Sequence, residues 1–248
     1  PLPSGKRTLL AFFSALVDAV RASNAVLASG AEPVVLEFMD RSCIDAVSDY
    51  AGVSIPEGTG ALLLIELDGD EEYLAAANEL IIETLGKIGP LELKSASNPQ
   101  EREALWKLRK STSPAIARIA PLKFNEDICV PLSQIPAICS FIVELVERLD
   151  VRVVSFGHSG DGNLHINFMT HWKRPEEVMR VTRAVEELFR ETVRLGGTLS
   201  GEHGIGMMKR PYLGIALDEP TIAFEKKIKR ALDPENVFNP GKIFPQRG

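Results

Sequence analysis

The hydrophobic pattern of the first third of the chain predicts helices and strands in alternation. Residues 6–29 are amphipathic with helical spacing, and Gly30 supplies a stop signal, so this segment is predicted to be one helix. From residue 33 onward, short apolar runs bounded by turn residues predict strands. The predicted elements here are a strand at 33–39, a short helix through Cys43, Ile44 and Val47, a strand at 61–67, a helix at 71–85 and an edge strand at 91–94.

The same pattern continues through the remaining two thirds. A helix is predicted at 98–119, where Asn98 can cap the first turn and Pro99 suits the first helical position. The other predicted elements are a strand at 124–130, a helix at 133–149 capped by Ser133, strands at 151–156 and 164–169, and helices at 174–195 and 219–232. Residues 233–244 are rich in turn residues but carry aromatic side chains of the kind that are usually buried, so they are expected to pack against some surface.

Strands with helices between them, and at least one hairpin, predict an α+β fold. The expected architecture is a largely antiparallel sheet with ferredoxin-like βαβ elements, covered by helices on one side. The sequence shows no internal repeat and no flexible linker, so residues 1–248 are expected to form one domain rather than two.

Composition and charge narrow the possible partners. The net charge is −6 and the isoelectric point is about 5.4, which argues against nucleic acid and an anionic membrane surface. No apolar run approaches the roughly 20 residues of a transmembrane helix. The three cysteines are scattered, which suits a reducing compartment and offers no metal-ligand spacing. A cytoplasmic protein, or one held peripherally at a membrane by partners, is therefore expected.

The chemically richest stretch surrounds a glycine-rich turn at 159–162. Two of the four histidines, His158 and His165, flank this turn seven residues apart. Alternation along the strand at 164–169 would place His165 on the polar side, opposite the apolar residues that face the core. A hairpin through the turn would then bring His158 close to His165.

A second glycine-rich loop at 201–206 carries Glu202 and His203. Two neutral imidazoles and one carboxylate are a common three-ligand set for a catalytic divalent metal, and Glu202 is the best candidate for the carboxylate. Histidines that are merely structural remain the alternative. A phosphate-binding loop is disfavoured, because the Walker spacing is absent and Glu202 would repel a phosphate.

Three motifs, in this order, resemble the C-terminal half of FAD-linked 2-hydroxyacid oxidases of the vanillyl-alcohol-oxidase superfamily. They are Gly157-His-Ser-Gly-Asp-Gly-Asn-Leu-His165, Ser200-Gly-Glu-His-Gly-Ile-Gly206 and Asn239-Pro-Gly-Lys242. The likeness covers essentially the whole chain and includes Leu36-Glu-Phe-Met-Asp40, Leu64-Ile-Glu-Leu-Asp-Gly69 and Trp106-Lys-Leu-Arg-Lys110. It is closest to the glycolate oxidase flavoprotein-subunit and D-lactate dehydrogenase types.

The resemblance implies a role for each matching residue. His158, His165 and Glu202 would bind a divalent metal such as Zn, Mn or Fe, and His203 would be the general base. Arg109 would bind the substrate carboxylate, for which a guanidinium fork is suited. The remaining implied contacts are Asn167 and Ser113 with the substrate and Asn239 and Gly204 with the flavin.

Two departures from the pattern concern the substrate. Some members bind a second carboxylate with a lysine, but here that position is Asn125 and the nearby Lys123 is displaced by two residues. Ser113 stands where those members have a threonine. Both differences favour a small 2-hydroxy acid over a dicarboxylate.

The resemblance also implies that an FAD-binding domain precedes Pro1 in cis. This chain is then expected to be the cap, or substrate, domain of an oxidoreductase that converts glycolate or a small D-2-hydroxy acid such as D-lactate to the 2-oxo acid. Alone it would be inactive. Iron–sulfur or other electron-transfer subunits would be its partners. The alternatives are a stand-alone metal- or ligand-binding module and a flavin-independent metal hydrolase.

Overall fold

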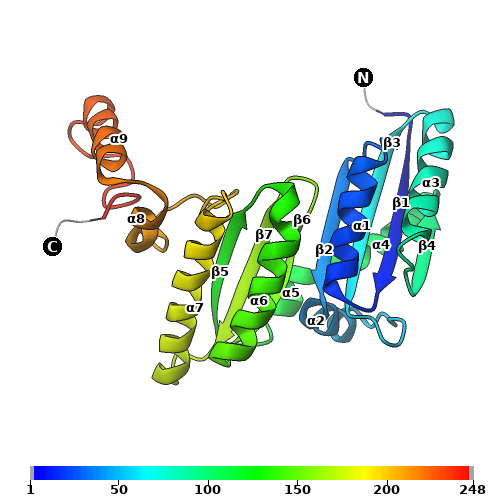
Figure 1. Ribbon diagram of the computed structural model, residues 1–248, viewed down its shortest axis with the longest axis horizontal. Helices are drawn as coiled ribbons and strands as arrows, with labels where there is room; N and C mark the ends of the chain where they lie inside the picture. The colour runs from blue at the N-terminus through cyan, green and yellow to red at the C-terminus, as the bar shows by residue number, and fades with distance from the viewer. Residues whose placement is uncertain (1–2, 246–248) are drawn as a thin grey trace.

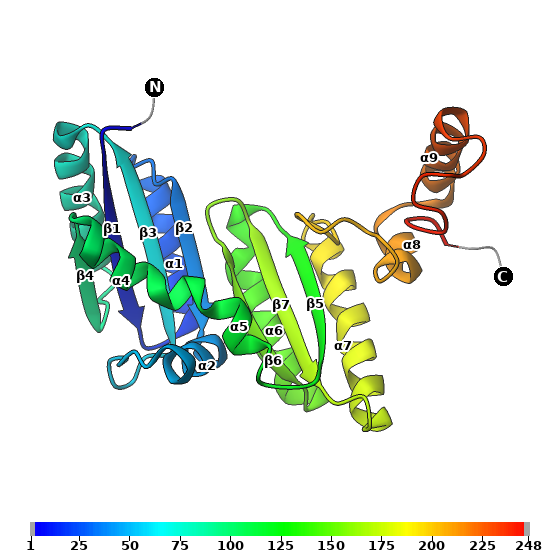
Figure 2. The same cartoon turned by 180° about the vertical axis from the view of Figure 1, so that it is seen from behind.

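The computed structural model describes residues 3–245, which form one antiparallel seven-stranded sheet with helices on both faces (Figures 1 and 2). The strand order is β4-β1-β3-β2-β6-β7-β5. The strands are β1 (Gly5–Phe13), β2 (Val35–Asp40), β3 (Ala61–Gly69), β4 (Glu92–Ala96), β5 (Leu122–Cys129), β6 (Arg152–His158) and β7 (Asn163–Thr170). The predicted α+β class and the largely antiparallel sheet are confirmed.

Helices α1, α3, α6 and α7 cover one face of the sheet, and α2, α4 and α5 lie on the other (Figure 2). The helices are α1 (Leu16–Ala28), α2 (Arg41–Ala51), α3 (Glu71–Gly86), α4 (Pro99–Lys110), α5 (Thr112–Ile116), α6 (Ile135–Leu149), α7 (Pro175–Arg194), α8 (Leu213–Ala216) and α9 (Glu219–Leu232). The expectation of helices on one side only was therefore wrong, because several strands are apolar on both faces.

The largest correction concerns the predicted helix at 6–29. Its first part is the strand β1, which lies between β4 and β3, and only Leu16–Ala28 is helical. Leu9 packs in the core under α1 and α3, whereas Leu10 packs in the core on the opposite face. A strand that is buried on both faces is continuously apolar, and such a run has no period that distinguishes it from a buried helix.

The first half of the sheet has the ferredoxin-like arrangement that was predicted. Helix α1 connects β1 to β2 and α3 connects β3 to β4, giving the order β4-β1-β3-β2. Strand β2 then pairs with β6, so its Leu36–Asp40 segment lies beside the hairpin formed by β6 and β7. This pairing joins residues from both halves of the sheet at one place.

The hairpin segment follows the predicted alternation. Leu164, Ile166 and Phe168 are fully buried in the core beneath the helices, so His165 projects from the other face. One helix start differs from the prediction. Ser133 is not a cap, because a 3-10 turn at Leu132–Gln134 precedes α6, which begins at Ile135.

Beyond α8 the chain leaves the sheet and forms an arm that carries α9 (Figures 1 and 2). No residue of α9 is buried, and Val237 and Phe238 after it are exposed. Within residues 3–245 most of the 233–244 segment is uncovered, so its expected packing stays a prediction. The three cysteines are free thiols, as expected. Within residues 3–245, no helix combines the length and apolar character needed to cross a membrane.

Gly157 offers a test of the close approach between β6 and β7. A Cβ at this position would collide with the backbone of Asn163 and lie 2.9 Å from Leu164 Cα, whereas at Gly160 it would meet only Leu36 Cβ at 3.5 Å. We expect Gly157→Ala to lower the free energy of unfolding by about 1–3 kcal/mol, because the strands must separate. Gly160→Ala is the matched control. Equal urea-unfolding midpoints for the two variants would contradict the close approach.

Candidate metal and substrate site

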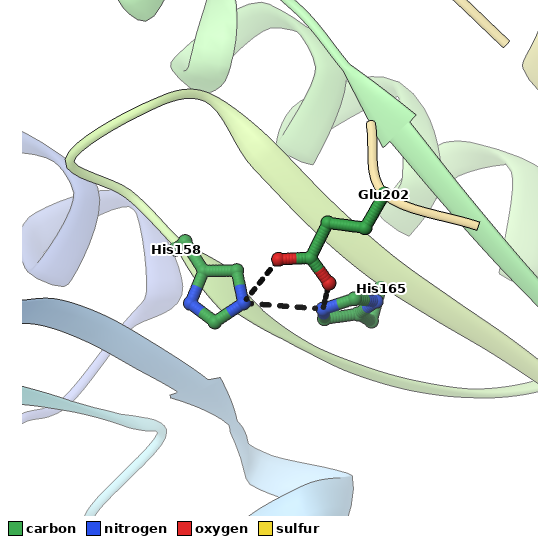
Figure 3. A group of neighbouring side chains, drawn as sticks. All are labelled: His158, His165 and Glu202. Carbon is green, nitrogen blue, oxygen red and sulfur yellow. Dashed lines mark hydrogen bonds and ion pairs between the residues drawn. The ribbon is translucent and has the colours of Figure 1, made fainter. Parts of the chain in front are cut away.

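Three side chains from two separate segments meet at the open face of the β6–β7 hairpin (Figure 3). His158 ends β6, His165 lies in β7, and Glu202 comes from the loop that follows α7. His158 Nε2 lies 3.4 Å from His165 Nε2 and 3.4 Å from Glu202 Oε1, and His165 Nε2 lies 3.9 Å from Glu202 Oε2. The structure thus brings together the three residues predicted as metal ligands.

The spacing of these three atoms fits a divalent ion. An ion bound tetrahedrally at about 2.1 Å holds its donor atoms roughly 3.4 Å apart, close to the separations seen here. Each residue offers one potential ligand atom, and the three atoms lie within 4.8 Å of one another. Glu202 is 56% exposed on its side chain, so one side of the group is open to a further ligand. These three residues could therefore hold a metal ion with one coordination position left open.

His158 is held by a carboxylate that the sequence reasoning did not identify. Its Nδ1 contacts Glu37 Oε1, and this partner and its charge raise the pKa of His158. Burial by itself would raise the pKa of Glu37, but the hydrogen bond from His158 and the charge of Arg109 outweigh it and keep that pKa low. An ionised carboxylate can only accept, so this contact assigns a proton to Nδ1 of His158 and leaves Nε2 as the atom that faces Glu202.

His165 is arranged to remain neutral. Burial, reinforced by the nearby His158, lowers the pKa of His165 to about 4. At neutral pH its imidazole therefore carries no proton that a metal ion would have to displace. This is the protonation state that metal ligation requires.

Asp127 in β5 fixes the loop that carries Glu202 and His203. The Asp127 carboxylate is fully buried and accepts the backbone N–H of Glu202 at 2.6 Å and of His203 at 2.7 Å. The buried ammonium of Lys209 pairs with the same carboxylate and donates to Leu199 O at 2.7 Å. Burial would raise the pKa of Asp127, but these donors lower it, with Lys209 making the largest favourable contribution.

The predicted base, His203, lies beside the metal-binding group. Its ring stacks on that of His165 with 5.5 Å between centroids, and its Nδ1 is 3.4 Å from Asp127 Oδ1. The side chain is 39% exposed, so it is accessible to a ligand in the open site. A His–Asp contact of this kind orients the ring and directs Nε2 away from the carboxylate.

Arg109, predicted to bind the substrate carboxylate, reaches the site from α4. Its Nε donates to Glu37 Oε2 at 2.8 Å, and its guanidinium carbon lies 5.0 Å from the centroid of the Phe156 ring. Within residues 3–245 its two Nη atoms donate no hydrogen bond. That edge of the guanidinium is the one that can bind a carboxylate in bidentate fashion.

The two other predicted substrate contacts differ in their placement. Asn167 shares a strand face with His165 and is only 1% exposed; its Nδ2 donates to Val154 O, and its Oδ1 has no protein partner within the described residues. Its burial leaves this oxygen no accessible surface through which a ligand could reach it, so the predicted contact with the substrate stays a prediction. Ser113 lies exposed in the first turn of α5, four residues after Arg109, and its hydroxyl makes no hydrogen bond to residues 3–245.

The residues predicted to contact flavin lie near each other on exposed loops. Gly204 has a left-handed φ of 73°, and a Cβ there would meet no atom within 4 Å. Asn239 has a φ of 50° in the turn that leads back to this loop, where Ile243 N donates to Gly206 O at 2.8 Å. This bond places the residue that follows the third motif against the end of the second motif.

Sequence reasoning missed Glu37, Asp127 and Lys209, which hold the site residues in place. Glu37 lies in the predicted strand at 33–39 and Asp127 in the predicted strand at 124–130, and each is a charged residue next to apolar ones. A carboxylate in such a position needs a partner, which was the available signal. A cavity of about 590 Å³ lies where β6 begins and β7 ends, and none of the site residues lines it. It is larger than the cavity of about 350 Å³ that Glu37, His158 and Glu202 line.

The family described as "FAD linked oxidases, C-terminal domain" matches residues 2–243. Among curated proteins, the chain is similar to "Glycolate oxidase subunit GlcD" of Bacillus subtilis, with 37% identity over 98% of this chain and 52% of that protein. It is also similar to "D-lactate dehydrogenase" of Anaerostipes hadrus, with 29% identity over 98% of this chain and 53% of that protein. The chain therefore spans about half the length of these relatives.

Among solved structures, p-cresol methylhydroxylase with substrate bound matches 98% of this chain and 53% of its own. The TM-score is 0.74 and the sequence identity is 14%. At that identity the likeness establishes the fold alone. It confirms the α+β architecture that was predicted from the sequence.

The buried pair of Asp127 and Lys209 should dominate the stability of this region. We expect Lys209→Met to cost roughly 3–5 kcal/mol of unfolding free energy, because it leaves a buried carboxylate without its cation. Lys87→Met is the control, since Lys87 pairs with Glu83 on the surface of α3 and its loss should cause no measurable change. Urea unfolding of both variants checks this, and a Lys209→Met midpoint equal to the control would contradict the assigned role.

Proposed function

The chain belongs to the C-terminal domain family of FAD-linked oxidases, and on this premise we propose that it is the substrate domain of a flavin-dependent oxidoreductase. The substrate class is glycolate or a small D-2-hydroxy acid such as D-lactate, and the product is the 2-oxo acid. The names of both curated relatives support this class. The observation that carries the proposal is the convergence of a metal-ligand set, a histidine and an arginine on one open face.

The metal ligands of this proposal are His158, His165 and Glu202. When bound, the ion would supply Lewis acidity that lowers the pKa of the substrate hydroxyl, and the flavin would take up the hydride released from C2. His203 accepts the hydroxyl proton, because its ring adjoins that of His165 and its Nδ1 faces Asp127. Loss of the proton and the hydride together converts the C2 alcohol to a carbonyl.

Arg109 binds the carboxylate of the substrate through its free Nη edge. Since its Nε is held by Glu37 and its face lies on Phe156, the guanidinium is fixed before the substrate arrives, which contributes a proximity effect. Asn167, on the strand face of His165, and Ser113, four residues after Arg109, complete the proposed substrate contacts.

A small substrate is favoured by the residues of β5. Asn125 of β5 is the cross-strand partner of Asn167 of β7, so the side chain beside Asn167 is a neutral amide. An amide offers no charge to a second carboxylate. The cation nearby in sequence, Lys123, pairs with Met169 farther from the metal ligands.

An FAD-binding domain in cis, to which the flavin is mostly bound, completes the proposal. The chain spans about half the length of its relatives, and its arm presents a face that nothing in residues 3–245 covers. Phe224, Ile228 and Leu232 recur every four residues on α9 and are 63%, 46% and 79% exposed. This apolar stripe is the surface on which we propose the other half of the protein packs.

Further subunits are part of the proposal as well. A relative that is named a glycolate oxidase subunit supports an assembly of more than one chain. That iron–sulfur or other electron-transfer proteins in it reoxidise the flavin stays a prediction. A cytoplasmic location, with attachment to the inner face of a membrane through such subunits, stays a prediction.

The function is tested on the full-length protein that contains this domain. We expect a yellow preparation whose flavin is bleached anaerobically by glycolate or D-lactate and not by L-lactate. His165→Ala should abolish metal retention and most of the bleaching rate, because it removes a proposed ligand. His171→Ala, at the far end of β7, is the control.

Colourless protein would overturn the oxidoreductase and favour the hydrolase or the binding module. Full metal content and a normal bleaching rate in His165→Ala would instead overturn the ligand assignment alone.

The packing of the arm is tested by adding a charge to its apolar stripe. In the full-length protein, Phe224→Glu should lower both the melting midpoint and the FAD content, because a carboxylate would be buried between the domains. Val143→Glu on α6, where Val143 is 51% exposed, should change neither. Equal behaviour of the two variants would show that the stripe faces solvent.

A further inference from the structure

Glu37 is a buried carboxylate that connects the metal ligands to the carboxylate-binding arginine. It lies in the middle of β2, where it pairs with His158 of β6, and it is 7% exposed. Its two oxygens have different partners: Oε1 contacts His158 Nδ1, and Oε2 accepts from Arg109 Nε at 2.8 Å.

The contacts continue into a closed ring of five side chains. Arg109 lies over Phe156, and the Phe156 ring centroid is 5.0 Å from that of His165, its cross-strand partner. His165 Nε2 returns to His158 Nε2 at 3.4 Å, and His158 contacts Glu37. Figure 3 shows that His158 uses the same nitrogen toward His165 and Glu202, which leaves the other nitrogen for Glu37.

We propose that Glu37 is a positioning residue that sets the metal ligand His158 and the carboxylate-binding Arg109 in register with each other. This inference rests on the proposed function. A carboxylate only accepts hydrogen bonds, so it fixes His158 as the Nδ1–H tautomer and frees Nε2 for the metal. The other oxygen holds Nε of Arg109 and thereby directs the Nη edge. One residue thus determines the distance between the ion and the substrate carboxylate.

The neutral analogue glutamine cannot hold both partners. If its oxygen faces Arg109, its NH2 group faces His158 Nδ1, which must then accept and so carries the proton on Nε2, where it blocks the metal. If its oxygen faces His158, the NH2 group opposes Arg109 Nε–H, and the guanidinium is released. Either arrangement uncouples the two functions, whereas a residue that is merely structural would tolerate an isosteric amide.

The test compares Glu37→Gln with Glu66→Gln in the full-length protein. Glu66 is also a buried glutamate on a neighbouring strand, and it is bonded to Lys6, Thr8 and Trp106 rather than to the site. Metal affinity is measured by Zn²⁺ titration against a competing chelator, and KM with the best hydroxy acid. We expect Glu37→Gln to weaken Zn²⁺ binding about 10–100-fold and to raise KM, with FAD content unchanged.

A ¹⁵N NMR spectrum of the histidine rings adds a readout that loss of stability would not move. Recorded in metal-free protein at a pH above the raised pKa of His158, it should show His158 as the Nδ1–H tautomer in the wild type and in Glu66→Gln, but not in Glu37→Gln. Wild-type Zn²⁺ affinity and KM in Glu37→Gln would overturn the proposal, as would equal losses in Glu66→Gln.

The outcome separates this inference from the proposed function. Wild-type protein that binds no Zn²⁺ would overturn the coupling, yet flavin bleaching by a hydroxy acid could still uphold the oxidoreductase. A protein that binds Zn²⁺ with the expected loss in Glu37→Gln, but without flavin reduction, would retain the role of Glu37 toward His158 and refute the oxidoreductase.

Discussion

The candidate site depends above all on the buried ion pair between Asp127 and Lys209. A carboxylate inside an edge strand would be costly by itself, and the ammonium together with two backbone N–H groups compensates it. These donors belong to the segment that presents Glu202 and His203. The interaction that makes the buried charge tolerable is thus the same one that attaches the second glycine-rich loop to the sheet.

The sheet supplies the other half of the arrangement through its register. Phe156 lies opposite His165, and Glu37 lies opposite His158, so four side chains share one face. Gly157 permits β7 to approach β6 closely between these pairs. A shift of one residue in either pairing would turn the imidazoles into the apolar core, so packing of Leu164, Ile166 and Phe168 on the opposite face also specifies the site.

The Asp127–Lys209 pair and the strand register together hold the donor atoms in place from the sheet side and leave their other side open to solvent. The Glu37 carboxylate contacts Nδ1 of His158, and the Asp127 carboxylate lies near Nδ1 of His203. The guanidinium of Arg109 packs over the ring of Phe156. The arm that carries α9 returns its tail to Gly206, next to this open side. Such an arrangement suits a site that is completed by a second domain with its flavin, as we propose for the full-length protein.

The sequence by itself determined most of the strands and longer helices after residue 33, the α+β class and the identity of the three residues that meet at the site. It did not predict α8, and its single helix at 98–119 is divided into α4 and α5. Local periodicity and histidines flanked by glycines are short-range patterns, so they can be recognised without knowing the tertiary structure. The N-terminal strand β1 was misjudged, because burial on both faces removes the period that marks a strand. Only the tertiary structure decided the roles of Glu37, Asp127 and Lys209. Their partners lie 72 to 121 residues away for Glu37 and 82 residues away for the Asp127–Lys209 pair, and such long-range pairings leave no local pattern in the chain.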